Sequence, residues 1–118
     1  MQLEKFLDYI SKEKRYSIHT LTSYKTDLNQ FFLFVNTEFS VSDLSKVNFK
    51  MIRNWISHLL ESGLKSVSVN RKISSIKSYF KFIEMSGFSY YNPTLKITSP
   101  KTSKRLPIFI KKIILIIS

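Results

Sequence analysis

Residues 65–83 read KSVSVNRKISSIKSYFKFI, and this stretch decides the fold of the chain. Its apolar residues recur at steps of three and four, which predicts an amphipathic helix with one buried row: Val69, Ile73, Ile76, Phe80 and Ile83. The same stretch has five basic residues and no acidic one, together with several small serines. Because cations neutralise phosphates and serines let a backbone approach closely, the polar faces of this helix suit a polyanion.

The charge of the whole chain agrees with that helix. Across 118 residues, 19 Lys and Arg stand against 8 Asp and Glu, which gives a formal net charge of +11. Such an excess favours nucleic acid or an anionic membrane surface as the partner over an acidic small molecule. The last acidic residue is Glu84, so the final part of the chain is purely cationic. The length suffices for one domain with a helical core.

The absence of cysteine, of a signal peptide and of a long apolar run predicts a cytoplasmic protein. The chain has no cysteine, which excludes disulfides and thiolate metal sites and fits a reducing compartment. Its N-terminus has acids among the apolar residues and no continuous apolar run, unlike a signal peptide. The concentrated apolar run at residues 113–117 is far too short to span a bilayer. We therefore expect a cytoplasmic protein with no membrane partner.

Three further helices are predicted before residue 65. The first ends near residues 12–15 and has its apolar positions at Leu3, Phe6, Leu7 and Ile10. Ser17 is a suitable N-cap for the second helix, whose apolar row is Leu21, Tyr24, Leu28, Phe31, Phe32 and Val35. Residues 36–46 are rich in turn-forming residues and are predicted to be a loop. The third helix stops at Gly63 and has an apolar face of Ile52, Trp55, Ile56, Leu59 and Leu60.

The fourth helix is the one that residues 65–83 define. Ser66 is its predicted N-cap and Gly87 its predicted end. Beyond it, three prolines break regular structure, so residues 88–118 are predicted to be an extended basic strap. No segment has the alternation of a strand. The sequence thus predicts an all-α fold, with a compact four-helix domain over residues 1–87 followed by the strap.

Catalytic and cofactor-binding patterns are missing from the sequence. His19 and His58 stand outside any metal-binding spacing, and we expect both to be solvated or partly packed imidazoles. The carboxylates are scattered, and no G-x-S-x-G motif surrounds a serine. Two glycines are too few for a phosphate-binding P-loop or a Rossmann turn. We therefore expect a non-catalytic chain with no cofactor, no metal and no small-molecule substrate.

Three motifs follow one another along the chain. The first is Ser17-x-x-Thr20-x-x-x-Tyr24-x-x-Asp27-Leu28-x-x-Phe31. The second comes after Gly63 and is Ser68-x-x-Arg71-x-x-Ser74-x-x-Lys77-x-Tyr79-Phe80-x-Phe82. The third is Asn92-Pro93-x-x-x-Ile97-x-x-Pro100-Lys101-x-x-Lys104-Arg105-Leu106-Pro107. Together, over residues 3–109, they resemble the N-terminal core-binding domain of tyrosine site-specific recombinases, the integrase family that includes the Xer-type enzymes.

The resemblance implies a four-helix domain of SAM-like type that forms one half of a clamp around duplex DNA during recombination or integration. In such enzymes a separate C-terminal domain carries the tyrosine nucleophile, and that domain is not in this sequence. The relatives usually continue after residue 109 into a helix with acidic residues, whereas this chain reads IKKIILIIS. We expect a truncated or frameshifted recombinase or an expressed fragment, with a stand-alone binding module as the alternative.

The candidate DNA-contacting residues come from three segments. The N-terminal half of the fourth helix is expected at the major groove, because an α-helix fits there and its first turn offers unpaired N–H groups to a phosphate. Its candidates, divided between two flanks of the apolar row, are Ser66, Ser68, Asn70, Arg71, Lys72, Ser75 and Lys77. Which flank faces the DNA stays open at this point. The second helix adds Thr20 and Lys25, and the strap adds Lys101, Lys104 and Arg105.

Several of these residues also have a structural interpretation, and two other functions fit the composition. Arg71 suits an ion pair with Asp27, and Tyr24 suits a core position. A helix-turn-helix regulator would also be small, basic and all-α, with residues 63–66 as its turn. A protein-interaction module would bind intact recombinase protomers through Leu33 and Phe34, unless these two merely cover the first helix.

Overall fold

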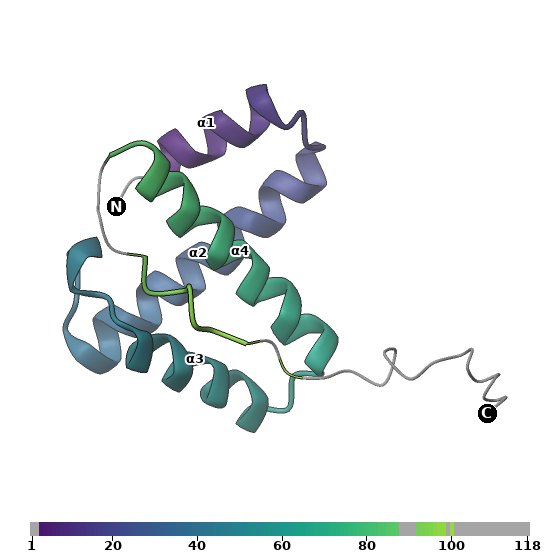
Figure 1. Cartoon of the computed structure of the whole chain (residues 1–118). Coiled ribbons are helices and arrows are strands. Elements are labelled where there is room, and N and C mark those ends of the chain that lie inside the picture. The colour runs from purple at the N-terminus through teal and green to yellow at the C-terminus, as the bar shows by residue number, and fades with distance from the viewer. Residues whose placement is uncertain (1–2, 88–91, 99, 101–118) are drawn as a thin grey trace, which may run out of the picture.

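Two long helices cross at the centre of the structure, and two shorter ones flank them (Figure 1). The computed structural model describes residues 3–87, 92–98 and 100. The helices are α1 (Leu3–Glu13), α2 (Ile18–Phe39), α3 (Phe49–Glu61) and α4 (Ser66–Met85), with a short 3-10 helix, η1 (Leu44–Lys46), before α3. Within these residues there is no strand, so the predicted all-α fold of four helices is confirmed.

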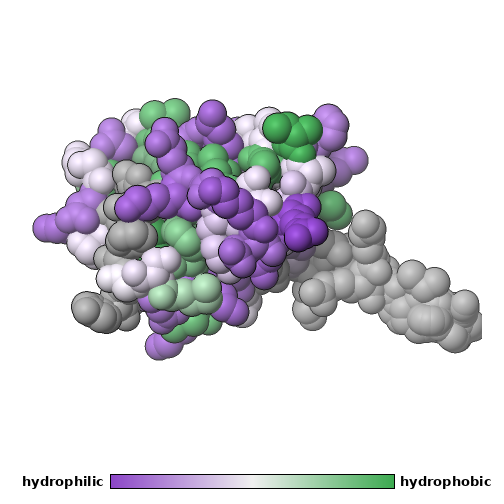
Figure 2. All heavy atoms as spheres, turned by 90° about the horizontal axis from the view of Figure 1, so that it is seen from above, coloured by the Kyte–Doolittle hydropathy of each residue, from purple (hydrophilic) through white to green (hydrophobic). Residues whose placement is uncertain are grey.

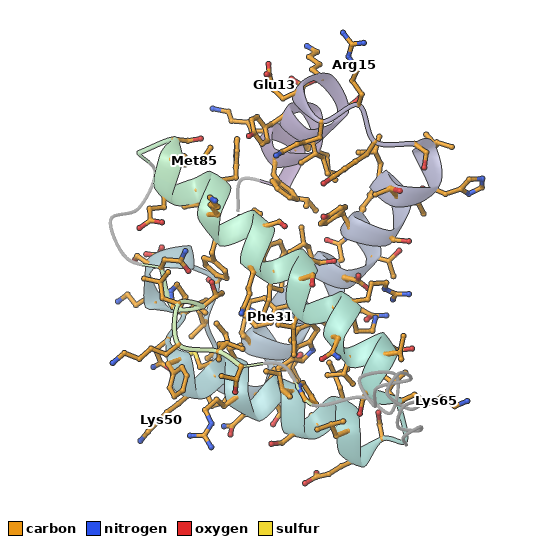
Figure 3. The ribbon with its side chains drawn as sticks, turned by 45° about the vertical axis from the view of Figure 1, so that its right-hand side comes forward. Glu13, Arg15, Phe31, Lys50, Lys65 and Met85 are labelled. Atoms are coloured by element: carbon orange, nitrogen blue, oxygen red, sulfur yellow. The ribbon has the colours of Figure 1, made fainter. Side chains whose placement is uncertain are left out.

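The core lies where α2 and α4 cross. The predicted row of α4 is at most 1% exposed at every position: Val69, Ile73, Ile76, Phe80 and Ile83. Phe31 of α2 points into the space between the two helices (Figure 3) and lies edge-on to Trp55 of α3, with 5.0 Å between ring centroids. Each large side chain buried in this way contributes about 1.5–3 kcal/mol before the loss of chain entropy. The crossing of α2 and α4 is therefore the most strongly held part of the fold.

The helix ends match the predicted cap residues with one exception. Ser17 Oγ accepts a hydrogen bond from the Thr20 N–H at 3.2 Å and caps α2 as predicted. Gly63 and Gly87 follow α3 and α4 with φ of 97° and 78°, a left-handed conformation that glycine adopts easily. The predicted N-cap of α4 is wrong by one residue. Lys65 occupies that position without a side-chain hydrogen bond, and Ser66 is the first helical residue.

Helix α2 is longer than the sequence predicts. The turn-rich stretch 36–46 is predicted to be a loop, but the helix continues to Phe39. Ser40 then ends it in the left-handed conformation, φ 56°, and donates its N–H to the Asn36 carbonyl at 3.0 Å. The Phe39 ring packs against Phe34, with 6.1 Å between centroids. Phe39 is also partly buried against the core, and the prediction fails here because this packing outweighs the local preference for a turn.

Residues 92–98 pack against the four-helix body between α3 and α4 (Figure 1). The chain turns here, because the Ile97 N–H donates to the Thr94 carbonyl at 3.1 Å. Ile97 is 4% exposed, and Lys77 of α4 donates to its carbonyl at 2.8 Å. The extended form predicted for the strap is therefore wrong for this part. Lys101, Lys104 and Arg105 lie outside the described residues, and the domain division at residue 87 stays a prediction.

The outer surface is largely hydrophilic on the α1 side. Figure 2 shows that face, on which polar side chains cover most of the area and apolar ones form separate patches. Large apolar side chains are nevertheless exposed elsewhere on the described surface, including Leu33 of α2 at 67%. None of the helices described is long and apolar enough to cross a bilayer.

Candidate functional site

A buried carboxylate joins the two crossing helices. Asp27 of α2 is fully buried, and three side chains of α4 reach its oxygens. Lys72 Nζ lies 2.9 Å from Oδ1, and Arg71 Nη2 lies 3.0 Å from the same oxygen. Ser75 Oγ donates to Oδ2 at 2.9 Å. The cost of burying this charge is thus offset by two cations and a hydroxyl. The ion pair that the sequence suggests between Arg71 and Asp27 is present.

Lys72 and Ser75 are interior residues. They are 6% and 4% exposed, and Lys72 also donates to Gln30 Oε1 of α2 at 2.6 Å. Their polar atoms therefore bind α2 and offer no free group at the surface. Both belong to the predicted set of DNA contacts, which assumes an exposed flank of α4. The structure buries these two residues of the flank against α2 instead.

The burial of Lys72 follows from helical geometry. Lys72 lies three residues after Val69 and four before Ile76, which places it beside the buried row. Across from it, α2 presents Asp27 and Gln30, which are three residues apart and share one face. Gln30 is a site residue that the sequence analysis missed, and its spacing from Asp27 is the signal that identifies it.

Arg71 stays at the surface. Its side chain is 54% exposed, and it contacts Asp27 through one terminal nitrogen. A guanidinium has five donors in a planar fork, so most of this fork faces outward. Lys72 and Ser75 bind Asp27 without help from Arg71. The arrangement therefore anchors one terminal nitrogen of the guanidinium on Asp27 and leaves its other donors able to bind an anion.

The other flank of α4 holds the segment that follows the helices. Asn70 Nδ2 donates to the Pro100 carbonyl at 3.1 Å, and Lys77 Nζ donates to the Ile97 carbonyl. Asn70 Oδ1 is buried and has no partner among the described residues. One flank of α4 thus faces α2 and the other faces residues 97–100. Among the candidate cations of α4, Arg71 is the one that is mainly exposed.

The remaining candidates lie in α2 and in the first turn of α4. Lys25 is exposed and comes two residues before Asp27, a spacing that puts it on a different face of α2 from the one that meets α4. Ser66 and Ser68 are half-buried in the first turn of α4. The Thr20 hydroxyl lies 3.1 Å from Ser17 Oγ and so belongs to the cap of α2.

Tyr24 has the structural role that the sequence suggests. Its side chain is half-buried, stacks on Tyr16 at 5.7 Å between centroids and meets Phe6 edge-on. Burial raises the pKa of the Tyr24 hydroxyl above its usual value, and a hydrogen bond with Ser78 opposes that shift. Tyr24 therefore packs against the core without being fully buried, and its hydroxyl has a partner.

The histidines and the second candidate surface, at Leu33 and Phe34, involve other side chains than Arg71. His19 is exposed, and the His58 ring packs 5.3 Å from Phe34, so both are solvated or partly packed as expected. In the described part of the chain no three potential ligands are close enough to hold a metal ion. Leu33 and Phe34 line a hollow of about 450 Å³ with residues of α3. The interpretation that they cover the first helix is therefore wrong, because they face α3.

Sequence comparison places this fold among known families. A family model described as the phage integrase N-terminal SAM-like domain matches residues 3–87, which include all four helices. The chain belongs to this family. The predicted SAM-like fold and the resemblance to the N-terminal domain of tyrosine recombinases are thereby confirmed.

Relatives of the SAM-like domain are tyrosine recombinases. The chain is 34% identical to tyrosine recombinase XerC of Oceanobacillus iheyensis over 93% of its own length and 36% of the relative's. It is 36% identical to tyrosine recombinase XerD of Rickettsia bellii, over 89% of this chain and 34% of that protein. It is 37% identical to tyrosine recombinase XerC of Listeria innocua, over 92% of this chain and 36% of that protein. The chain thus spans about a third of the length of these relatives. No solved structure matches it.

Proposed function

We propose that this SAM-like domain binds duplex DNA as the non-catalytic N-terminal part of a tyrosine recombinase. The observation that carries the proposal is the exposed guanidinium of Arg71, anchored on the buried Asp27 at the N-terminal half of α4. A planar cation held in one place binds a phosphate at low entropic cost.

The polar side chains of α2 and α4 support contact with the phosphates of DNA. Ser66 and Ser68 offer hydroxyl donors in the first turn of α4, and Lys25 adds an exposed cation from α2. Small donors and cations of this kind mostly contact the DNA backbone, which positions a protein without reading sequence. Asn70, Lys72, Ser75 and Lys77 would then act indirectly, because each binds protein atoms. Thr20 would position the start of α2 through its cap.

The strap residues extend the proposed contact along the duplex. We propose that Lys101, Lys104 and Arg105 follow the phosphate backbone towards the catalytic part of the enzyme. With Lys25 and Arg71 they make about five phosphate contacts, for which log affinity falls with log salt at a slope of roughly −4.5. Strand cleavage would belong to another part of the recombinase, because the match covers only about a third of the relatives' length.

The family match favours this function over a helix-turn-helix regulator. A second candidate is contact with another recombinase protomer. It is favoured by one observation, the 67% exposure of Leu33 beside the hollow between α2 and α3. An exposed leucine next to an apolar hollow is typical of a protein-binding surface.

A salt-dependent titration tests DNA binding. Fluorescence anisotropy with a labelled duplex should give a Kd that rises roughly 500-fold between about 50 mM and about 200 mM salt, as five phosphate contacts require. The variant Arg71→Ala should lower the slope by about 0.9. A matched control is Lys12→Ala, which removes a cation of α1 that pairs with Asp8. The proposal fails if the parent does not bind, or if its Kd is insensitive to salt.

A further inference from the structure

A cationic hollow lies between α3 and the segment that follows α4, and Arg71 is not among the residues that line it. Its volume is about 310 Å³. α3 lines it with Phe49, Arg53 and Ser57, and the segment lines it with Lys96 and Thr98. No carboxylate lines this hollow.

Two cations face this hollow without a counter-ion. Arg53 and Lys96 are both exposed, and neither takes part in an ion pair within residues 3–87, 92–98 and 100. Like charges around one hollow repel each other, and an anion between them relieves that repulsion. The hydroxyls of Ser57 and Thr98 add two neutral donors to the same wall.

The wall contributed by the segment is fixed in place. Ile97 is 4% exposed, its N–H donates to the Thr94 carbonyl and its carbonyl accepts from Lys77. Because both backbone groups of Ile97 are bonded, its neighbours Lys96 and Thr98 are held facing outward. A site whose donors are already positioned loses less entropy when it binds a ligand.

The opposite wall orients the arginine. The Arg53 guanidinium lies over the Phe49 ring, 5.5 Å from its centroid. This contact holds the planar fork beside Phe49, which lines the same hollow. Next to Phe49, Lys50 points away from the body at the first turn of α3 (Figure 3) and adds positive potential to this side of the molecule.

We propose that this hollow binds a phosphate group, with Arg53 as a bidentate donor, Lys96 as a second cation and the two hydroxyls completing the contact. The phosphate is either a phosphodiester of the DNA backbone or a free phosphate ion. The first source deepens the proposed function and rests on it. It adds α3 and residues 96–98 to the surface that meets DNA. The second source does not depend on DNA binding.

The chain offers a matched control in another hollow. That hollow, of about 320 Å³, is lined by Lys14 and Lys81 but otherwise mainly by aromatic and aliphatic side chains such as Tyr9 and Phe82. The double variants Arg53→Gln/Lys96→Gln and Lys14→Gln/Lys81→Gln remove the same charge from hollows of similar size. Only the first removes a guanidinium fork that stands beside two hydroxyls.

Chemical-shift mapping on the 118-residue chain tests the phosphate site. Inorganic phosphate, added against sodium chloride at equal ionic strength, should shift the Ser57 and Thr98 amides in the parent and in the control. It should leave both amides unmoved in Arg53→Gln/Lys96→Gln. The proposal is overturned if phosphate shifts these amides of the parent no more than chloride does and a DNA duplex does not shift them either.

A titration with a DNA duplex then distinguishes the two sources of the phosphate group. With a DNA backbone as the ligand, the duplex shifts the same amides, and Arg53→Gln/Lys96→Gln lowers the salt slope by about 1.8 while the control double variant leaves it unchanged. If the duplex binds without these effects but phosphate still shifts the amides, the source is a free phosphate ion. If the duplex does not bind at all, the proposed function fails while the phosphate arm still decides this inference. If neither ligand moves the amides, the site does not exist.

Discussion

Lys72 of α4 donates a hydrogen bond to the fully buried carboxylate of Asp27 of α2 at 2.9 Å, and Lys72 itself is 6% exposed. This ion pair lies between the two longest helices of the fold. Buried charges are tolerated only when their partners are close and further hydrogen bonds satisfy them, which Ser75 and Gln30 do here. The pair therefore fixes how α2 and α4 meet, and with it the position of Arg71.

Truncating Asp27 should destabilise the domain severely. In Asp27→Ala the Lys72 ammonium loses its carboxylate while remaining buried, so we expect the free energy of unfolding to fall by about 3–5 kcal/mol. Urea denaturation followed by circular dichroism measures this loss, with the slope of the transition unchanged. The matched control is Asp8→Ala, whose exposed pair with Lys12 is worth about 0.3–0.5 kcal/mol. Equal losses in the two variants would contradict the structural role of Asp27.

Arg71 and Lys72 are neighbours in sequence but should behave differently. Lys72→Ala leaves Asp27 with fewer donors in the interior, so we expect a loss of about 3 kcal/mol in stability. Arg71→Ala removes a half-exposed pair and should cost about 1 kcal/mol or less, while lowering the salt slope of DNA binding by about 1. Denaturation and anisotropy titration of both variants test this contrast. A larger stability loss in Arg71→Ala than in Lys72→Ala would refute the assignment of roles.

The start of α4 can be improved. Lys65 is its N-cap without a side-chain hydrogen bond, and its positive charge lies at the positive end of the helix dipole. Lys65→Ser supplies a capping hydroxyl and should raise the free energy of unfolding by about 1 kcal/mol. The control is Ser66→Ala, which should change stability by less than about 0.5 kcal/mol because Ser66 does not cap the helix. If Ser66→Ala instead costs as much as losing a cap, the boundary is wrong.

Tyr24 should contribute to alkaline sensitivity. Burial raises the pKa of Tyr24 above 10.0, so above that pH the unfolded chain releases this proton while the folded chain keeps it. The unfolded state then binds fewer protons, and the free energy of unfolding falls as pH rises. Urea denaturation between pH 10.0 and about pH 11 should show a steeper loss for the parent than for Tyr24→Phe. Parallel losses would rule out this contribution.

Helical periodicity is enough to predict most of this fold. The steps of three and four that define Val69, Ile73 and Ile76 predict the buried row of α4, and the structure confirms it. Ser17 and Gly63 mark helix ends through local chemistry, which a sequence displays directly. The extension of α2 to Phe39 escapes such reasoning, because it depends on packing of Phe39 against a core that other helices complete.

The candidate site is less predictable than the fold. A single sequence gives two polar flanks of α4 but not which neighbour each flank meets. The buried position of Lys72 is readable in retrospect from its distances of three and four to Val69 and Ile76. The positive charge of Lys72 predicts an exposed position, and only the carboxylate of Asp27 in the facing helix makes a buried position favourable.

The location of DNA on the domain is the most direct test of the account. Amide chemical-shift mapping of the 118-residue chain with a short duplex at low salt should move residues around Arg71, Ser68 and Lys25. Amides near Leu33 and His58, on the α2–α3 hollow, should not move. Shifts confined to that hollow, or no shifts with any duplex, would contradict the claim that the surface around the Asp27–Arg71 pair binds DNA.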